Sequence, residues 1–257
     1  MTLQELLDTL RVDILGDRTD RVAGTPDYLW SDAFLVRAIN EAQRRFARKG
    51  LIIRDGSSDL TKVCLQTGQN EYALDPCILA VMSARYQDDN TDLKRAGHAV
   101  LDTYTIPDTY FFDPSQLSSF PDGKPLAFAT DEYLSTDDYD SVSAVTLRVF
   151  PTPSADYNCK YVNLRVVRMP QVDLTTADMT AVPEIPSDHH FEMLDWAAYL
   201  ALRIVDHDVE DTGRADRFKA SFEENVKLAR DNAMRKMFTP AAWGFGKNGF
   251  SWTRDAY

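Results

Sequence analysis

Residues 30–50 read WSDAFLVRAINEAQRRFARKG. Apolar side chains recur in this stretch at intervals of three or four residues, the spacing that places them on one face of a helix. They are Phe34, Leu35, Ala38, Ile39, Ala42 and Phe46. The other face is charged and carries Arg37, Glu41, Arg44, Arg45 and Arg48. Ser31 suits the N-cap and Gly50 suits the end, so the stretch predicts an amphipathic helix that packs against other helices.

Working toward the N-terminus, a second helix is indicated by a capping box, in which Thr2 and Glu5 exchange hydrogen bonds with each other's backbone. Its apolar residues again have helical spacing, and they are Leu3, Leu6, Leu7, Leu10 and Ile14. Gly16 is placed to end this helix.

Helical periodicity returns after Pro186, where Ser187 is a candidate N-cap. The apolar face that follows is wide, which predicts a helix buried on more than one side. It comprises Phe191, Met193, Leu194, Ala197, Ala198, Leu200, Ala201, Ile204 and Val205. Thr212-Gly213 is expected to break this helix before another begins. The last predicted helix has apolar residues at Phe218, Phe222, Val226, Ala229, Ala233 and Met237.

Between the two helical regions the pattern changes to short runs rich in β-branched and aromatic residues. The best strands are 145–150 and 159–167, and Pro151 to Asp156 is interpreted as the loop of a hairpin between them. The stretch 102–122 is interpreted as a packed loop. The predicted fold class is α+β: a four-helix frame from residues 1–50 with 186–237, a β-rich insertion at 51–185, and an extended C-terminal tail at 238–257.

The composition excludes several classes of protein. The chain has 257 residues and a formal net charge of −12, the wrong sign for gripping nucleic acid through its phosphates. Residues 101–140 hold nine acids and one base, a local sum of −8. The three cysteines are odd in number and widely spaced, which argues against a disulfide framework and favours a reducing compartment. We expect no signal peptide and no membrane span.

Candidate polar sites are weak. His189 and His190 are adjacent, so on a helix they point about 100° apart and share one metal ion poorly. His207, Asp208, Glu210 and Asp211 fall at a predicted helix end, and Asp137-Asp138-Tyr139-Asp140 lacks the spacing of an EF-hand. Phosphate-binding and nucleophile motifs are not present in the sequence. We predict a non-enzyme with no catalytic residue, no cofactor and no metal.

The tail is aromatic and contains three glycines, and it has neither helical nor strand periodicity. Its aromatic residues are Phe238, Trp243, Phe245, Phe250, Trp252 and Tyr257. The apolar burial that these rings offer nearly cancels the entropy lost on ordering the segment. We therefore expect the tail to order only in a well-shaped groove of a partner, the alternative being an arm folded back on its own domain.

Several of these motifs occur in the order found in one family. Residues 30–45 resemble the second helix of the head–tail adaptor (connector) proteins of tailed bacteriophages. Residues 67–76, TGQNEYALDP, resemble the first strand of their insertion. Residues 147–153, LRVFPTP, with the strand from Tyr161 to Pro170, resemble their proline-rich hairpin, and Ile185 to His190 resembles the entry to their third helix. The resemblance covers about residues 1–237.

This resemblance implies a homo-oligomeric ring of about twelve copies beneath the portal protein, with tail proteins below it and DNA passing through its lumen without sequence-specific binding. It further implies a virion protein of the head–tail interface that assembles in the host cytoplasm, and it suggests the portal or a neighbouring copy as the partner of the tail. A second reading remains open, in which the chain is a tail nozzle, tail tube or fibre adaptor protein. A hydrolase is the most remote reading.

Overall fold

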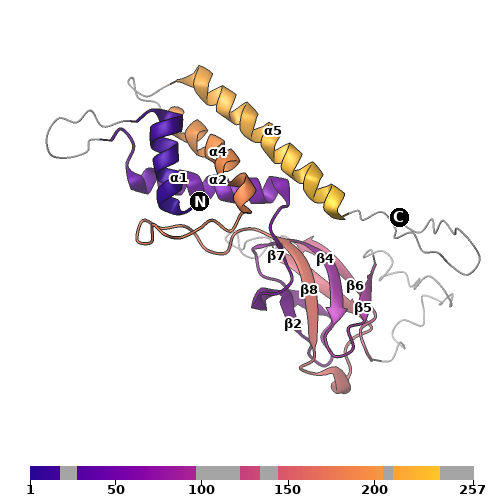
Figure 1. The fold of residues 1–257 in the computed structure, drawn as a ribbon. Coiled ribbons are helices and arrows are strands. Elements are labelled where there is room, and N and C mark those ends of the chain that lie inside the picture. Colours follow the sequence, from indigo (N-terminus) through magenta and orange to yellow (C-terminus); the bar gives the residue numbers. More distant parts are fainter. Residues whose placement is uncertain (18–27, 97–121, 134–143, 205–210, 238–257) are drawn as a thin grey trace, which may run out of the picture.

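The computed structural model describes residues 1–17, 28–96, 122–133, 144–204 and 211–237. Its helices gather at one end of the molecule and its sheet at the other (Figure 1). The helices are α1 (Leu3–Asp8), α2 (Asp32–Gly50), α4 (His190–Leu202) and α5 (Thr212–Met237). A mixed α+β fold with a four-helix frame is therefore confirmed. The tail 238–257 and nearly all of the predicted loop at 102–122 lie outside the described residues.

The N-terminal helical stretch begins and ends where the sequence predicts, but it consists of the α-helix α1 followed by a π-helical segment. The Thr2 backbone N–H donates to the Glu5 carboxylate (3.0 Å), and the Glu5 N–H donates to the Thr2 hydroxyl (3.3 Å). After α1 the chain continues as a π-helical segment, η1 (Thr9–Leu15), and Gly16 ends it with a left-handed φ of 74°. Leu10 and Ile14 of this segment lie in the helical core.

Helix α2 begins as expected but ends differently. The Phe34 N–H donates to the Ser31 hydroxyl, which confirms the N-cap (3.3 Å). The left-handed residue at the other end is Leu51, with φ 53°, whereas Gly50 is the last helical residue. A Cβ on Gly50 would lie 3.3 Å from the side chain of Ile52. The glycine therefore permits close packing of the turn instead of supplying the left-handed backbone.

Three expectations about the C-terminal helices are wrong in detail. Ser187 starts a short 3₁₀ turn, η5 (Ser187–His189), and its side chain makes no cap. Thr212 and Gly213 are the first residues of α5, because the Arg214 N–H is capped by the Asp211 carboxylate (2.9 Å). Phe191, placed on the buried stripe by periodicity, is 57% exposed, since α2 and α5 cover the other sides of α4.

The helical core is built around α4, which is buried on several sides as predicted. Met193, Leu194, Ala197, Ala198 and Ala201 are fully buried. Aromatic rings close the core between the helices. Phe222 of α5 contacts Phe46 edge-on (5.6 Å between ring centroids) and lies 5.2 Å from Trp196. Helices from both ends of the chain thus share one core, which also includes Ile53, Leu174 and Ile185.

The insertion folds into a curled, mixed sheet with its own core. Its strands are β1 (Arg54–Asp55), β2 (Lys62–Cys64), β3 (Glu71–Ala73), β4 (Ile78–Tyr86), β5 (Asp92–Arg95), β6 (Ala127–Tyr133), β7 (Ala144–Phe150) and β8 (Tyr161–Arg168). The order is β1-β8-β4-β5-β6-β7-β3, with β2 also on β8. Among the described strands only β5 and β6 pair in parallel. The predicted strands at 145–150 and 159–167 correspond to β7 and β8.

The predicted hairpin between β7 and β8 is wrong. β7 pairs with β6 and β3, whereas β8 pairs with β4, β1 and β2. The connection from Pro151 to Lys160 crosses between these two groups of strands. Two contacts fix this connection in place. The carbonyl of Pro153 accepts a hydrogen bond from the Gly68 N–H (3.0 Å), and Gly123 forms an isolated β-bridge with Pro153. Proline at two of its positions removes donors that a hairpin ladder would need.

The segment from Met169 to Pro186 returns the chain from β8 to the helices and packs on them. The side-chain amide of Asn40 donates to the Leu174 carbonyl (2.8 Å) and accepts from the Leu174 N–H (2.9 Å). Further along, the N–H groups of Leu3 and Gln4 donate to the carbonyls of Ala181 and Met179. The described contacts therefore attach this segment to the helical frame. The limits assigned to the insertion, 51–185, stay a prediction.

Substitution of Asn40 by alanine tests that attachment. It leaves the buried N–H and carbonyl of Leu174 without partners, which costs about 1–3 kcal/mol for each group. We expect urea denaturation to show a loss of about 2–5 kcal/mol in the free energy of unfolding. The control is Asn232→Ala, which removes the same amide from an exposed position of α5. An equal loss in both variants would contradict the role of Asn40.

Candidate functional site

The described residues offer three places where polar chemistry is concentrated: the junction between helices and sheet, a groove beside the sheet, and a pocket on the helical frame. The junction is centred on Arg168 at the end of β8. Its guanidinium binds the carboxylate of Asp55 (2.8 Å) and also that of Glu184. Nearby, Arg54 donates to the carbonyl of Ala233 on α5, which joins the sheet directly to the longest helix.

Both carboxylates of the junction accept several hydrogen bonds from neighbouring residues. Burial by itself raises the pKa of Asp55, but hydrogen bonds from the N–H of Ser57, from Ser58 and from Arg168 outweigh it and hold that pKa well below its usual range. Burial likewise raises the pKa of Glu184, and Arg168 with the N–H groups of Val172 and Gln171 lowers it overall. The junction is thus a partly buried, hydrogen-bonded ion triad.

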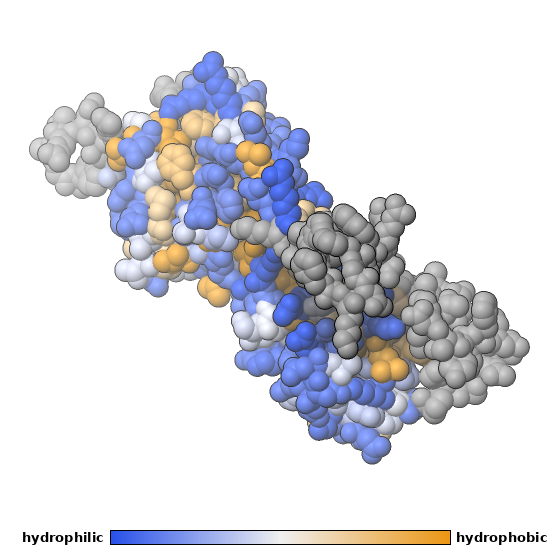
Figure 2. All heavy atoms as spheres, turned by 45° about the vertical axis from the view of Figure 1, so that its right-hand side comes forward, coloured by the Kyte–Doolittle hydropathy of each residue, from blue (hydrophilic) through white to orange (hydrophobic). Residues whose placement is uncertain are grey.

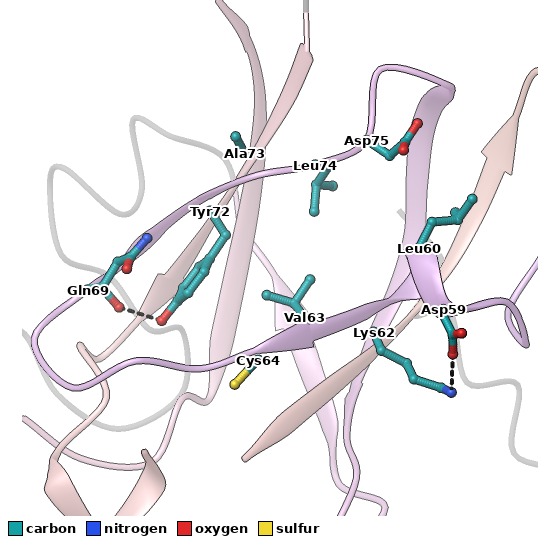
Figure 3. Close-up of a pocket in the computed structure, with 10 residues that line it drawn as sticks. All are labelled: Asp59, Leu60, Lys62, Val63, Cys64, Gln69, Tyr72, Ala73, Leu74 and Asp75. Atoms are coloured by element: carbon teal, nitrogen blue, oxygen red, sulfur yellow. Dashed lines mark hydrogen bonds and ion pairs between the residues drawn. The ribbon is translucent and has the colours of Figure 1, made fainter. Parts of the chain in front are cut away.

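The groove lies between β2 and β3, has a volume of about 480 Å³ and is shown in Figure 3. Val63, Tyr72 and Leu74 are its buried apolar residues. The Tyr72 hydroxyl donates to the Gln69 carbonyl (2.8 Å), and Lys62 pairs with Asp59 (2.8 Å). In the described part of the sheet, β2 and β3 each pair on one side only. The groove is therefore bounded by two strand edges that are open among the described residues.

The frame pocket is a hollow of about 540 Å³ lined by α2, α4 and α5. Its residues are Arg45, Trp196, Tyr199, Leu200, Arg203, Ile204 and Lys219. The Arg45 guanidinium stacks on the indole of Trp196 (3.8 Å to the ring centroid), and Arg203 donates to the Tyr199 hydroxyl (2.6 Å). The side chain of Arg45, predicted on the solvent face of α2, thus lies against an aromatic ring. The pocket combines cations with an aromatic floor.

A buried carboxyl, Asp195, lies between α4 and α5. It accepts from the Ser221 hydroxyl (2.7 Å) and from the Asn225 amide (3.5 Å). Burial is the main cause that raises the pKa of Asp195 above its usual value. The carboxyl has no basic partner among its described contacts, so its charged form destabilises the fold.

The histidines of the sequence analysis have structural partners. His189 pairs with Glu192 (2.7 Å), and the buried His190 contacts the carbonyl of Ile185 (2.8 Å). Within the described ranges, no group of three or more histidine, cysteine or acidic side chains is arranged to hold a metal ion. His207, Asp208, Glu210 and the run Asp137 to Asp140 lie outside those ranges, as do all six tail residues predicted to bind a partner. No described helix is long and apolar enough to cross a membrane.

The sequence that folds in this way matches the model of one known family. The family model for the SU10 adaptor protein matches residues 1–243. The chain belongs to the SU10 adaptor protein family. The resemblance to phage adaptors that the motifs indicated is confirmed, and this SU10 adaptor is a phage structural protein. No curated protein matches the chain.

Sequence reasoning missed the junction and the frame pocket of this SU10 adaptor. Arg168, Asp55 and Glu184 come from three separate segments, and none stands in a motif. The only available signal was that Arg168 directly follows the predicted strand 159–167. Trp196 and Tyr199 are spaced three residues apart on a helix, which does predict neighbouring rings, here 4.7 Å apart.

Replacing Arg168 by methionine tests the junction. The change removes the cation that the two half-buried carboxylates share, and we expect a loss of about 1.5–3 kcal/mol in the free energy of unfolding at pH 7. Because the folded pKa values of Asp55 and Glu184 are lowered, their stabilising effect is present above the unfolded values of 3.8 and 4.5 and is lost as pH falls through the folded values.

The gap in stability between the wild type and Arg168→Met should therefore narrow as the pH is lowered from 7 to 3. Denaturant titrations at both pH values measure it. Arg165→Met, at an exposed position of the same strand, is the matched control and should change little. A gap that stays constant with pH would show that the carboxylates do not carry the effect.

Asp195→Asn should stabilise the protein at pH 7. The pKa of Asp195 is raised in the folded protein, so the folded state is most stable while this carboxyl is protonated. The free energy of unfolding then falls as the pH rises through the folded pKa of Asp195. Asparagine retains an acceptor for the Ser221 hydroxyl and carries no charge. We expect a higher urea midpoint at pH 7 and no gain at pH 3, with Glu224→Gln on exposed α5 as the control. A lower midpoint at pH 7 would refute this account.

Proposed function

We propose that this phage adaptor forms a homo-oligomeric ring of about twelve copies beneath the portal protein and joins the capsid to the tail proteins. The family match over residues 1–243 carries the proposal. The fold supports it, because a helical frame and a separate sheet give one chain two distinct ends for two sets of partners (Figure 1). The protein would then be located at the head–tail interface of the virion.

The charge of the chain suits the passage of DNA through such a ring. The net charge is −12, and hydrophilic residues cover most of the described surface in the view of Figure 2. A negatively charged channel repels phosphates and does not retain the DNA, so passage without sequence-specific binding follows from electrostatics. The open edges of β2 and β3 and the frame pocket leave room for protein partners on both ends of the molecule.

The aromatic tail is proposed as the arm that docks on the portal or on a neighbouring copy. Its residues are Phe238, Trp243, Phe245, Phe250, Trp252 and Tyr257. The family match ends at residue 243, so four of these six rings lie beyond it. Aromatic side chains dominate the binding energy of many protein interfaces, and a flexible arm gains affinity when several copies bind together.

Binding to the purified portal protein is the direct test of this function. We expect the full chain to bind the portal and form a closed ring on it, with the copy number measured by native mass spectrometry and electron microscopy. Binding to an existing adaptor–portal complex but not to the portal alone would contradict the proposal and indicate a tail nozzle protein. Copolymerisation into a tube would indicate a tail tube protein.

Removal of residues 244–257 tests the docking arm in the same assay. Circular dichroism should be unchanged, because the described core contains none of these residues, while portal binding should weaken at least tenfold, about 1.4 kcal/mol or more. Phe191→Ala is the matched control, since it removes one exposed aromatic ring from the frame. Unfolding of the shortened chain, or full retention of binding, would reject the docking arm.

A further inference from the structure

The frame pocket is rich in positive charge, and Asp216, which interacts with Arg203 from outside the pocket lining, balances only part of it. Arg45, Arg203 and Lys219 line it, and no carboxylate is among its lining residues. Within the described residues, none of these three cations forms an ion pair. They lie against aromatic rings instead. Arg45 contacts Trp196, and Arg203 and Lys219 contact Tyr199, with the ammonium of Lys219 lying 5.9 Å from that ring.

Two N–H groups at the pocket also lack acceptors. The indole Nε1 of Trp196 and the Nε of Arg45 are buried and have no hydrogen-bond partner in the described structure. Most buried polar groups in proteins are paired, so two unpaired donors at one hollow point to a missing acceptor. The pocket thus has the chemistry of a site for carboxylates with an apolar or aromatic neighbour, since Leu200 and Ile204 line its remaining wall.

The proposed ring, on which this inference rests, sets a condition on the contact between copies. Each copy has a net charge of −12, so side-by-side copies repel unless negative surface on one meets positive surface on the next. A closed ring uses a heterologous contact, in which two different patches of the same chain meet. The frame pocket is a positive patch suited to one side of that contact.

The acidic patch for the other side can be identified in the sequence. Residues 134–143 read LSTDDYDSVS, with Asp137, Asp138, Tyr139 and Asp140 and no basic residue. The segment joins β6 to β7, whose ends meet in the pair Tyr133–Ala144. Ten residues that leave and return at one point can reach roughly 16 Å from the sheet. We propose that the frame pocket of one copy binds the acidic segment 134–143 of the neighbouring copy.

The charges match in number, because three aspartates meet three cations, and the ring of Tyr139 offers an aromatic surface to Leu200 and Ile204. Nucleic acid is the competing occupant, since cations beside aromatic rings also bind single strands. The net charge of −12 disfavours it: a long polyanion is repelled by the whole surface, whereas a short acidic segment responds mainly to the charges nearest to it.

A peptide titration on the monomer tests the pocket without the portal. The acceptor is the full chain with Asp137→Asn, Asp138→Asn and Asp140→Asn, so that its own segment does not compete. The probe is a synthetic peptide of residues 134–143, followed by calorimetry and tryptophan fluorescence at low salt. We expect saturable binding that weakens at least tenfold in an acceptor that also carries Arg203→Gln and Lys219→Gln.

The matched control acceptor carries Lys227→Gln and Arg230→Gln, two exposed cations on α5 that do not line the pocket, and it should bind like the parent. A peptide with asparagine in place of the three aspartates should not bind. Absence of saturation, or equal binding of the asparagine peptide, overturns the proposal. Binding of a dT10 oligonucleotide with the same dependence on Arg203 and Lys219, in place of the peptide, assigns the pocket to nucleic acid and also overturns it.

Ring assembly on the portal then tests the contact between copies. The variant Arg203→Glu with Lys219→Glu should still attach but not close a ring, and Asp137→Lys with Asp138→Lys in the same chain should restore closure. Peptide binding with unaffected rings would overturn the proposal. Failure of the wild-type chain to bind any portal would refute the proposed function, while the peptide titration would still decide whether the pocket takes acidic segments.

Discussion

The burial of α4 is the constraint on which the rest of the structure depends. Its alanines, Ala197, Ala198 and Ala201, are fully buried and allow α2 and α5 to approach it closely. A helix that is apolar on most of its sides gains stability only when neighbours cover those sides, and here the neighbours come from both ends of the chain. Everything between α2 and α4 must therefore leave the frame and return to it.

That requirement explains the position of the insertion and its junction. The sheet has a separate apolar core, built from residues such as Phe128, Leu147 and Val166, so its interior gains nothing from the frame. The ion triad of Arg168, together with the bond from Arg54 to α5, supplies the directional contacts that set the sheet against the helices. Directional polar bonds specify an orientation, which apolar contact alone does poorly.

The helices could be predicted from the sequence, because their periodicity and caps are local signals: Thr2, Glu5, Ser31 and Gly16 act as expected. The pairing of β7 could not be predicted from the sequence, because strand pairing depends on contacts between residues that are distant in the chain. Here β7 pairs with β6 and β3 and not with β8. The contact between Arg45 and Trp196 could not be predicted either, because periodicity assigns Arg45 to the polar face of its helix but does not identify its neighbours on other helices. The predicted docking residues lie outside the described structure and stay a prediction.

Two strand edges, those of β2 and β3, are open among the described residues, and this has a consequence for aggregation. Unpaired strand edges template the pairing of further chains and so carry a risk of aggregation. Here β2 and β3 are each three residues long, and they carry the charged residues Lys62 and Glu71 at exposed positions. Edges this short and this charged offer too few hydrogen bonds to seed a fibril, so the sheet resists aggregation while its groove remains accessible.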